Sequence, residues 1–505
     1  MNKKNPICYF CMEYAVGEDA GSYAGGLGIL AGDYLLEAAK ENIPVIAIGL
    51  HYGQNISNDF FELTYIEVPV AGENLKVRVW QRNFKNSVTL LLLDTDVEGN
   101  SESSRKITSR LYDSDFYVRF KQEFLLGVGG VRVLKKYNIN PQVYHLNEGH
   151  TAFAALAIKA EDAKNQNNIV STKHTIFSAA GSFIPKNEFD NLIAPYCREN
   201  NLDPEVIFNL GKFELNEFMF STTKFMISSS RISNGVSVLH TVFEKKVHPH
   251  SKLIPVTNGV FKDRWQSNLW GKDPLNLSPE EFWRIKGKLR KKLLGSVLER
   301  TGIKMKEDVC TAVWARRFAA YKRPFLLFTD LNELEKIVSN KEKPIQFIIS
   351  GKAHRDDKEG IETIEKIKMI SKMPQFKGKV VYVPDYDIVV AKYLDQGADI
   401  WINTPERGKE ACGTSGLKAS LNGALQCTVS DGWVDEIDLS GKGWILDSEN
   451  TSLDLYKYLK DEIPQLFYQE NPPKELIKMM KSSMELIINH FDASRMLKDY
   501  LDKMY

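Results

Sequence analysis

Two series of short apolar runs, separated by amphipathic stretches, constrain the fold of this chain more than any other feature. The runs of the first half are Ile7–Tyr14, Pro44–Gly49, Val88–Leu93, Val143–Leu146 and Ser171–His174. Those of the second half are Val309–Trp314, Ile345–Ser350, Val380–Val383, Asp399–Asn403 and Leu425–Ser430. Stretches between them, such as Gly26–Glu41, Tyr117–Tyr137 and Thr151–Lys164, have helical spacing. This alternation predicts an α/β fold in which helices cover parallel sheets.

The two series indicate two domains, because 505 residues are too many for one ordinary core. A charged stretch over residues 265–308 separates them, and Ser278 followed by Pro279 marks a helix start within it. We therefore expect domains over residues 1–265 and 266–484, and a C-terminal helix over 485–505 that packs back on the first domain. Both domains are predicted to be Rossmann-like and doubly wound, with ligands in a cleft between them. This arrangement is the GT-B architecture.

Composition favours a globular enzyme over a nucleic-acid or membrane protein. Hydrophobic residues make up 43% and charged residues 26% of the chain, and the formal net charge is +1. No window reaches the length of a membrane span, and the first residues are too polar for a signal peptide. Of the six cysteines only Cys8 and Cys11 are close, so we expect no metal site. Free thiols without an export signal predict a cytoplasmic protein.

Four cations follow the first strand of the second series. They lie within Trp314-Ala-Arg-Arg-Phe-Ala-Ala-Tyr-Lys-Arg323 and are Arg316, Arg317, Lys322 and Arg323. Solvated charges are the usual explanation of such a run, but the apolar and aromatic neighbours favour partial burial. Burying this much positive charge is costly unless anions bind there. The segment is therefore predicted to bind phosphate groups.

Two further segments contain the residues that phosphate or aldehyde chemistry requires. Ser22–Gly32 has four glycines around the start of a predicted helix, so its backbone could approach a phosphate closely, although a structural turn explains the glycines equally well. The residues Gly26, Gly28 and Ala31 also fit the G-x-G-x-x-A pattern of dinucleotide sites. In the second half, Glu410-Ala-Cys-Gly-Thr-Ser-Gly-Leu-Lys418 ends in a lysine that could form a Schiff base.

Polar residues at strand ends complete the candidates. His174 follows the run that begins at Ser171, which would put its imidazole at the ligand edge of the sheet. Asn258 lies in the polar turn Val256-Thr-Asn-Gly-Val260 beside the expected domain boundary. In contrast, His145 and His51 are more simply explained as structural histidines.

Taken together, these segments resemble the α-glucan phosphorylases of glycogen, starch and maltodextrin, and most closely the bacterial and archaeal branch. The resemblance covers nearly the whole chain in the family's order. The matching motifs are Cys11–Tyr14, Ala24–Gly28, Asn147–His150, His174–Thr175, Asn234–His240, Val256–Gly259, Arg316–Arg323, Gly351–His354, Glu410–Lys418 and Leu421–Gly423. The chain is shorter than the well-known glycogen phosphorylases, and we expect no counterpart of their regulatory extension before Cys11.

The resemblance implies a role for each candidate residue. Lys418 would carry pyridoxal 5′-phosphate as an imine, with cofactor contacts from Arg316, Thr414, Ser415, Gly25 and Gly26. The substrate phosphate would be bound by Arg317, Lys322 and the backbone at Gly26. The sugar would be bound by His174, Asn258, Glu410, Cys412 and Gly413. The catalytic residues implied are Lys418, Arg317, Lys322 and His174.

The resemblance also implies the reaction, which is reversible phosphorolysis of α-1,4-glucan ends by inorganic phosphate. The product would be α-D-glucose 1-phosphate, formed with retention at the anomeric carbon. The 5′-phosphate of the cofactor would relay a proton to the substrate phosphate, since two phosphates held together share protons more readily than one alone. Family members are commonly dimers, so a homodimer is possible, and neither nucleic acid nor membrane is an expected partner.

Three other functions remain open from the sequence. A nucleotide-sugar glycosyltransferase of glycogen-synthase type would share the glycine segment, the cations and Glu410, but it would have no use for an imine-forming Lys418. A non-catalytic glucan-binding relative would need no catalytic residue at all. An NAD-dependent dehydrogenase rests only on the glycine pattern at Gly26 and Gly28.

Overall fold

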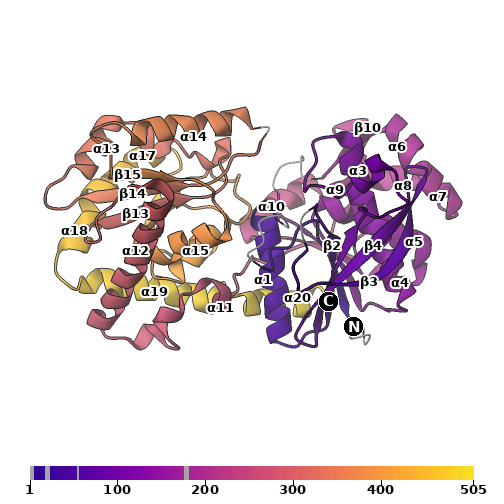
Figure 1. The fold of residues 1–505 in the computed structure, drawn as a ribbon, viewed down its shortest axis with the longest axis horizontal. Helices are drawn as coiled ribbons and strands as arrows, with labels where there is room; N and C mark the ends of the chain where they lie inside the picture. Colours follow the sequence, from indigo (N-terminus) through magenta and orange to yellow (C-terminus); the bar gives the residue numbers. More distant parts are fainter. Residues whose placement is uncertain (1–4, 18–22, 54–55, 176–180, 356) are drawn as a thin grey trace. The chain divides into compact units, whose positions relative to one another are not determined.

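The computed structural model describes residues 5–17, 23–53, 56–175, 181–355 and 357–505 (Figure 1). Contacts within the chain divide it into two compact units. Unit 1 comprises Met1–Thr257 and Met496–Tyr505, and unit 2 comprises Asn258–Arg495. The domain boundaries expected at residues 265 and 484 concern parts of the chain that fold independently, and they remain predictions.

Unit 2 contains a six-stranded, fully parallel sheet in the order β15-β14-β13-β16-β17-β18. The strands are β13 (Cys310–Ala315), β14 (Ile345–Ser350), β15 (Val380–Val383), β16 (Ile400–Asn403), β17 (Leu425–Val429) and β18 (Gly443–Leu446). In chain order, the first strand lies in the middle and the sheet grows outward from it in both directions. This is a doubly wound sheet, as the sequence predicts, and its strand order reverses between β13 and β16.

Both faces of this sheet are covered, which explains why its strands are apolar runs without alternation. Trp314 on β13 belongs to a core formed with α13 (Leu331–Val338), α14 (Lys358–Ser371) and α19 (Lys474–His490). Its neighbour Val313 points to the opposite face and packs in a second core. The helices that line this second core are α12 (Pro279–Thr301), α15 (Ile388–Gly397) and α16 (Ser415–Ser420).

Unit 1 contains a nine-stranded sheet in the order β12-β11-β7-β6-β1-β2-β5-β4-β3. Its strands are β1 (Ile7–Phe10), β2 (Val45–Leu50), β3 (Phe61–Val70), β4 (Glu73–Phe84), β5 (Val88–Asp94), β6 (Val143–Asn147), β7 (Ile169–Lys173), β11 (Ile232–Gly235) and β12 (Leu253–Pro255). The strands from β12 to β5 are parallel, and the strand order reverses at β1. The antiparallel pair of β3 and β4 at the edge was not predicted, because its residues alternate between buried and exposed instead of forming apolar runs.

The helix expected over Tyr117–Tyr137 is interrupted. It comprises α3 (Phe116–Phe124), a π-helical turn over Leu125–Gly129, and α4 (Gly130–Lys136). The irregularity coincides with close packing, since a Cβ on Gly127 would lie 2.3 Å from the backbone nitrogen of Ala154. Within the described ranges, no helix is long and apolar enough to cross a membrane.

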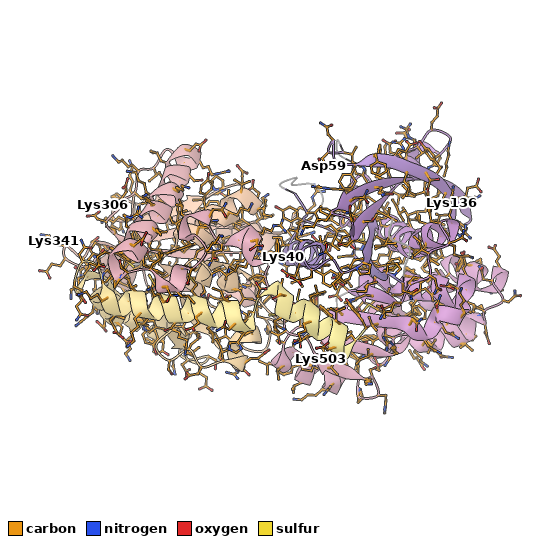
Figure 2. All side chains as sticks on the ribbon, turned by 90° about the horizontal axis from the view of Figure 1, so that it is seen from below. Lys40, Asp59, Lys136, Lys306, Lys341 and Lys503 are labelled. Carbon is orange, nitrogen blue, oxygen red and sulfur yellow. The ribbon has the colours of Figure 1, made fainter. Side chains whose placement is uncertain are left out.

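The chain ends in α20 (Ala493–Lys503), and Lys503 at its end is labelled in Figure 2. Its last residues belong to unit 1, where the hydroxyl groups of Tyr505 and Tyr34 lie 2.9 Å apart. The Tyr505 hydroxyl also lies 2.6 Å from Nδ1 of the buried His145, while the backbone carbonyl of Met504 accepts a bond of 2.7 Å from Arg231. His145 is thus a core histidine, as expected.

Candidate active site

Two buried cations share one carboxylate at the carboxyl end of β13 in unit 2. Arg316 directly follows β13, and its Nη2 lies 2.9 Å from Oε2 of Glu410. Nζ of Lys322 donates to both oxygens of Glu410, at 2.8 and 2.9 Å. The group lies where the strand order of the sheet reverses, which is the place where doubly wound sheets bind ligands. The backbone at Gly351 passes close to the backbone of Arg316, and a side chain does not fit there, because a Cβ on Gly351 would lie 1.9 Å from the carbonyl oxygen of Arg316.

The positive charge of this cluster exceeds what Glu410 neutralises. Arg316 is only 6% exposed, yet its Nε and Nη1 have no hydrogen-bond partner among the described residues. Buried guanidinium donors without partners are costly, and an anion would satisfy them. The geometry therefore fits a second anion beside Glu410.

The two kinds of charge in the cluster shift each other's ionisation. Burial and the neighbouring charge of Arg316 lower the pKa of Lys322 to about 7, although Glu410 opposes the shift. Burial disfavours the ionised form of Glu410, but the charges of Arg316 and Lys322 outweigh it and lower the pKa of this carboxyl. Glu410 is thus ionised at neutral pH, whereas Lys322 can gain or lose its proton near pH 7 when the charge beside it changes.

The structure does not gather all four predicted cations. Arg317 is exposed, in contrast to Arg316, although its charge still acts on Lys322. Arg323 is structural, since its guanidinium donates to the backbone carbonyls of Thr404 and Pro405 at 2.8 Å. Two of the four cations therefore form the buried cluster.

The segment from Glu410 to Lys418 is held against this cluster. A carboxylate oxygen of Asp431 accepts bonds from the backbone nitrogens of Gly408 and Glu410, at 2.9 and 3.0 Å. A Cβ on Gly413 would lie 2.9 Å from Nη2 of Arg316, so the backbone passes close to the guanidinium. The next candidate residues are half-buried, namely Cys412, Thr414 and Ser415.

Lys418 lies on α16 and is 5% exposed. Its Nζ lies 3.9 Å from the centroid of the Trp265 ring. The side-chain amide of Asn422 donates to the backbone carbonyls of both Lys418 and Trp265 at 3.0 Å, which fixes the two relative to each other. A buried amine beside an aromatic face fits a planar aldehyde cofactor.

Asn258 adds an unsatisfied acceptor to unit 2. Its side chain is 4% exposed, and its Oδ1 has no hydrogen-bond partner among the described residues. Its backbone carbonyl accepts a bond of 3.3 Å from Arg495. A buried amide oxygen held in this way is suited to accept a hydrogen bond from a ligand hydroxyl.

In unit 1, His174 directly follows β7 and is half-buried. Its Nε2–H donates to Oδ1 of Asn147 at 2.7 Å, and its backbone N–H donates to Glu148 at 2.8 Å. Burial, assisted by the charge of His240, lowers the pKa of His174 to about 3. The imidazole is therefore neutral at physiological pH, and it can exchange hydrogen bonds with hydroxyl groups but carries no charge for an anion.

The glycine segment of unit 1 also meets a carboxylate. Oε2 of Glu13 accepts bonds from the backbone nitrogens of Ala24 and Gly25, at 2.6 and 3.2 Å, and Tyr112 donates to its Oε1 at 2.6 Å. A Cβ on Gly25 or Gly26 would meet no described atom within 4 Å, so the described residues leave the backbone at the start of α1 (Gly26–Lys40) uncovered. Ser22 lies outside the described residues.

The sequence reasoning missed three residues that shape these sites, namely Glu13, Trp265 and Asp431. Glu13 is detectable in principle, because it lies just past a buried strand within the motif that begins at Cys11. Trp265 and Asp431 lie in segments whose approach to Lys418 and Glu410 depends on the tertiary fold.

The fold and the site define a protein of doubly wound α/β type with a buried cationic cluster and a buried lysine. Comparison with known proteins specifies the family. The family model described as carbohydrate phosphorylase matches residues 276–496. The maltodextrin phosphorylase of Thermococcus litoralis is 34% identical over 99% of this chain and 70% of its own length. The glycogen phosphorylase of Aquifex aeolicus is 30% identical over 99% of this chain and 86% of its own length. The chain belongs to the carbohydrate phosphorylase family.

The short form of the chain is shared by a third relative. An uncharacterized protein of Methanocaldococcus jannaschii is 30% identical over 99% of both chains. The match to the Thermococcus protein extends over 595 positions, against 505 residues in this chain, so that relative has inserted residues. The elements around Arg316, Lys322 and Lys418 are therefore built without those insertions.

Proposed function

We propose that this chain is an α-1,4-glucan phosphorylase. It cleaves the non-reducing end of glycogen or maltodextrin with inorganic phosphate and releases α-D-glucose 1-phosphate with retention. The observation that carries the proposal is the buried pair of Arg316 and Lys322, whose charge exceeds that of Glu410 and leaves two guanidinium donors unpaired. The names of the two phosphorylase relatives support the substrate class.

Pyridoxal 5′-phosphate is the cofactor we propose, attached to Lys418. The residues fit it, because the buried amine lies against the face of Trp265 and the unpaired donors of Arg316 suit a phosphate group. The other residues proposed to hold the cofactor are Thr414, Ser415, Gly25 and Gly26. When bound, the cofactor would supply a phosphate group that relays a proton to the substrate phosphate.

The remaining residues orient the substrates. Lys322 and Arg317, with the backbone at Gly26, are proposed to bind inorganic phosphate, and phosphate binding would favour the charged form of Lys322. Glu410 stays ionised because its pKa is lowered, so it accepts hydrogen bonds from sugar hydroxyls and does not act as an acid. The other sugar ligands proposed are neutral His174, Asn258, and the backbone at Cys412 and Gly413.

Trapping of the cofactor tests the first half of this proposal. Protein incubated with pyridoxal phosphate and reduced with borohydride should carry one pyridoxyl group on the peptide that contains Lys418. The Lys418→Ala variant should carry none there, while Lys409→Ala, which removes an exposed lysine nearby, should label like the wild type. Labelling elsewhere with an unmodified Lys418 would refute the cofactor assignment.

Product analysis tests the second half. Wild-type protein with cofactor, phosphate and a ladder of maltooligosaccharides should release glucose 1-phosphate, and Lys418→Ala should release none. Glucosyl transfer from a nucleotide-sugar in place of phosphorolysis would favour the glycosyltransferase reading. Glucan binding without either reaction would indicate a non-catalytic relative. A cytoplasmic location and a homodimer stay predictions.

A further inference from the structure

The segment Asn147–His150 of unit 1 contains a buried glutamate to which the proposed reaction assigns no role. Glu148 directly follows β6, is 2% exposed, and has φ 76° and ψ 159°. Glycine adopts this backbone region readily, whereas any other residue is strained in it and stays there only where its surroundings hold it. Residues strained in this way cluster at functional sites. A glutamate in a conformation suited to glycine indicates that its side chain is needed at this point.

Both oxygens of the Glu148 carboxylate accept hydrogen bonds. Oε1 accepts from the backbone nitrogen of Gly149 at 3.1 Å, at the start of the short helical turn Gly149–Thr151. Oε2 accepts from the backbone nitrogen of His174 at 2.8 Å and from the hydroxyl of Thr175 at 3.3 Å. Capping the turn requires one oxygen, so the second oxygen joins the end of β6 to the residues that follow β7.

A carboxylate suits these three donors because it offers acceptors on both sides. An amide in its place would turn its NH₂ group toward one of the two backbone N–H groups. Burial raises the pKa of Glu148, whereas the backbone donors of His174 and Gly149 and the charge of Lys173 act in the opposite direction. The bonds that compensate the buried carboxylate are thus the same bonds that hold the chain at two strand ends.

The neighbouring residue Asn147 holds the ring of His174. Asn147 is buried, and its Nδ2 donates to Sγ of Cys11 at 3.2 Å, which turns its Oδ1 toward His174. Nε2–H of His174 donates to that oxygen at 2.7 Å. With the proton on Nε2, Nδ1 is the acceptor of the neutral ring. Two consecutive residues at the end of β6 therefore hold the ring and the backbone of His174.

We propose that Glu148 is a positioning residue for His174. Its carboxylate anchors the backbone of His174, so that the ring stays bonded to Asn147 and presents Nδ1 to a hydroxyl group of the sugar. This inference rests on the proposed function, which makes His174 a sugar ligand. It adds a residue that acts through the position of His174 and does not itself bind the sugar. The strained backbone of Glu148 is what aims the carboxylate at the end of β7.

Hydrogen–deuterium exchange tests the anchor in the cofactor-free protein, without any substrate. Glu148→Gly removes the carboxylate and lets the backbone keep its conformation without strain. The exchange rate of the His174 amide, measured by mass spectrometry with fragmentation, should rise by about tenfold or more. Asp162→Asn is the matched control, since it removes a carboxylate that Tyr144 of β6 contacts at 2.6 Å, and it should leave this rate unchanged. An unchanged rate in Glu148→Gly, or an equal rise in the control, would overturn the proposal.

Glu148→Gln is a second variant, and it keeps the size of the side chain. Its NH₂ group must face one of the two sides, so the amide of Gly149 or that of His174 should exchange faster than in the wild type. Unchanged protection of both amides would contradict the requirement for a carboxylate, and with it the proposal.

A double-mutant cycle separates positioning from a general loss of stability. In the holoenzyme, Glu148→Gly should lower kcat/KM for maltooligosaccharides by about tenfold to a hundredfold, as small displacements of binding groups do. In a His174→Ala background the same change should lower it by less than about twofold, because no ring is left to position. Equal losses in both backgrounds would overturn the proposal. If the wild type released no glucose 1-phosphate, the proposed function would fail, while the exchange rates would still decide whether Glu148 anchors His174.

Discussion

Both units place a buried glutamate on groups that could hold an anion, and the two glutamates behave differently. Glu410 in unit 2 is 8% exposed and contacts the side chains of Arg316 and Lys322. Glu13 in unit 1 is 3% exposed and accepts bonds from the backbone nitrogens of Ala24 and Gly25 and from Tyr112. Each follows a strand at which its own sheet reverses order.

The pKa values of the two glutamates are shifted in opposite directions. Burial opposes the ionisation of Glu410, but two full positive charges outweigh it and the pKa is lowered. Burial also opposes the ionisation of Glu13, and its neutral donors do not outweigh it, so the pKa is raised. Cations therefore stabilise a buried carboxylate where backbone and hydroxyl dipoles only reduce its cost. The proposed anion site of unit 2 therefore relies on cations, whereas in unit 1 the backbone nitrogens of Ala24 and Gly25 are held by Glu13.

The largest effect is expected from removing a cation of unit 2. Arg316→Leu should lower kcat/KM for phosphorolysis by about a hundredfold to a thousandfold, as loss of one donor to a reacting anion does elsewhere. Arg284→Leu, which removes a guanidinium on α12 that is 55% exposed, should leave the rate unchanged. Equal rates in the two variants would show that the buried cations do not serve the anion.

Loss of Glu410 should have the next largest effect, on stability. Glu410→Gln leaves Arg316 and Lys322 without their shared carboxylate, which should cost about 3 kcal/mol in urea unfolding at pH 7. The pKa of Glu410 is lowered, so its contribution is present above its ordinary value of 4.5 and is lost as the pH falls below it. The difference in unfolding free energy between Glu410→Gln and the wild type should therefore shrink as the pH falls below 4.5. Glu406→Gln, on a carboxylate paired at the surface with Lys409, should change stability by less than about 0.5 kcal/mol.

The same contrast explains what the sequence could predict. The parallel strands were predictable from the apolar runs. Arg316 and Lys322 come directly after one of these runs, so their place at the carboxyl end of a strand was predictable too. That Arg316 would be buried, and Arg317 next to it exposed, was not predictable, because the direction of each side chain is set by how the loop folds after β13. The β3–β4 pair escaped prediction because half of its residues face solvent.

The backbone site of unit 1 was harder to predict than the cationic site of unit 2. Glycines indicate that a backbone can approach a ligand, but they do not specify which side chain meets the freed nitrogens. Glu13 reaches Ala24 and Gly25 from eleven and twelve positions earlier in the chain. Lys418 and Trp265 are farther apart in sequence, and the amide of Asn422 that joins them is a tertiary contact.

A smaller effect should follow from the titration of Lys322. Its pKa is lowered to about 7, so the free protein loses this charge as the pH rises above 7. Sulfate does not titrate in this range and is a suitable probe. The affinity of sulfate for the cofactor-free protein should fall about tenfold between pH 6 and pH 9, because the loss of one hydrogen bond to a charged group weakens binding by about that factor. Lys322→Arg, which stays charged, should bind sulfate independently of pH. A pH-dependent Lys322→Arg protein would assign the titration to another group.

The smallest effect should come from Glu13, and it should have the opposite pH dependence to that of Glu410. The pKa of Glu13 is raised, so its contribution to stability is fully present below the ordinary value of 4.5 and is lost as the pH rises through the folded pKa. Glutamine does not titrate, so it should remove this pH dependence. Glu13→Gln should change the free energy of unfolding by no more than about 1 kcal/mol.

Tyr112→Phe sharpens this last comparison, because the phenol donates to Glu13 at 2.6 Å. Its removal should cost about 1.5 kcal/mol or more at pH 7 in the wild type, where it leaves a buried carboxylate with one donor fewer, and less in the Glu13→Gln background. The two single variants and the double variant can be compared by urea unfolding. If Glu13→Gln proved as costly as Glu410→Gln, neutral donors would stabilise a buried carboxylate as well as cations do, and the distinction between the two units would disappear.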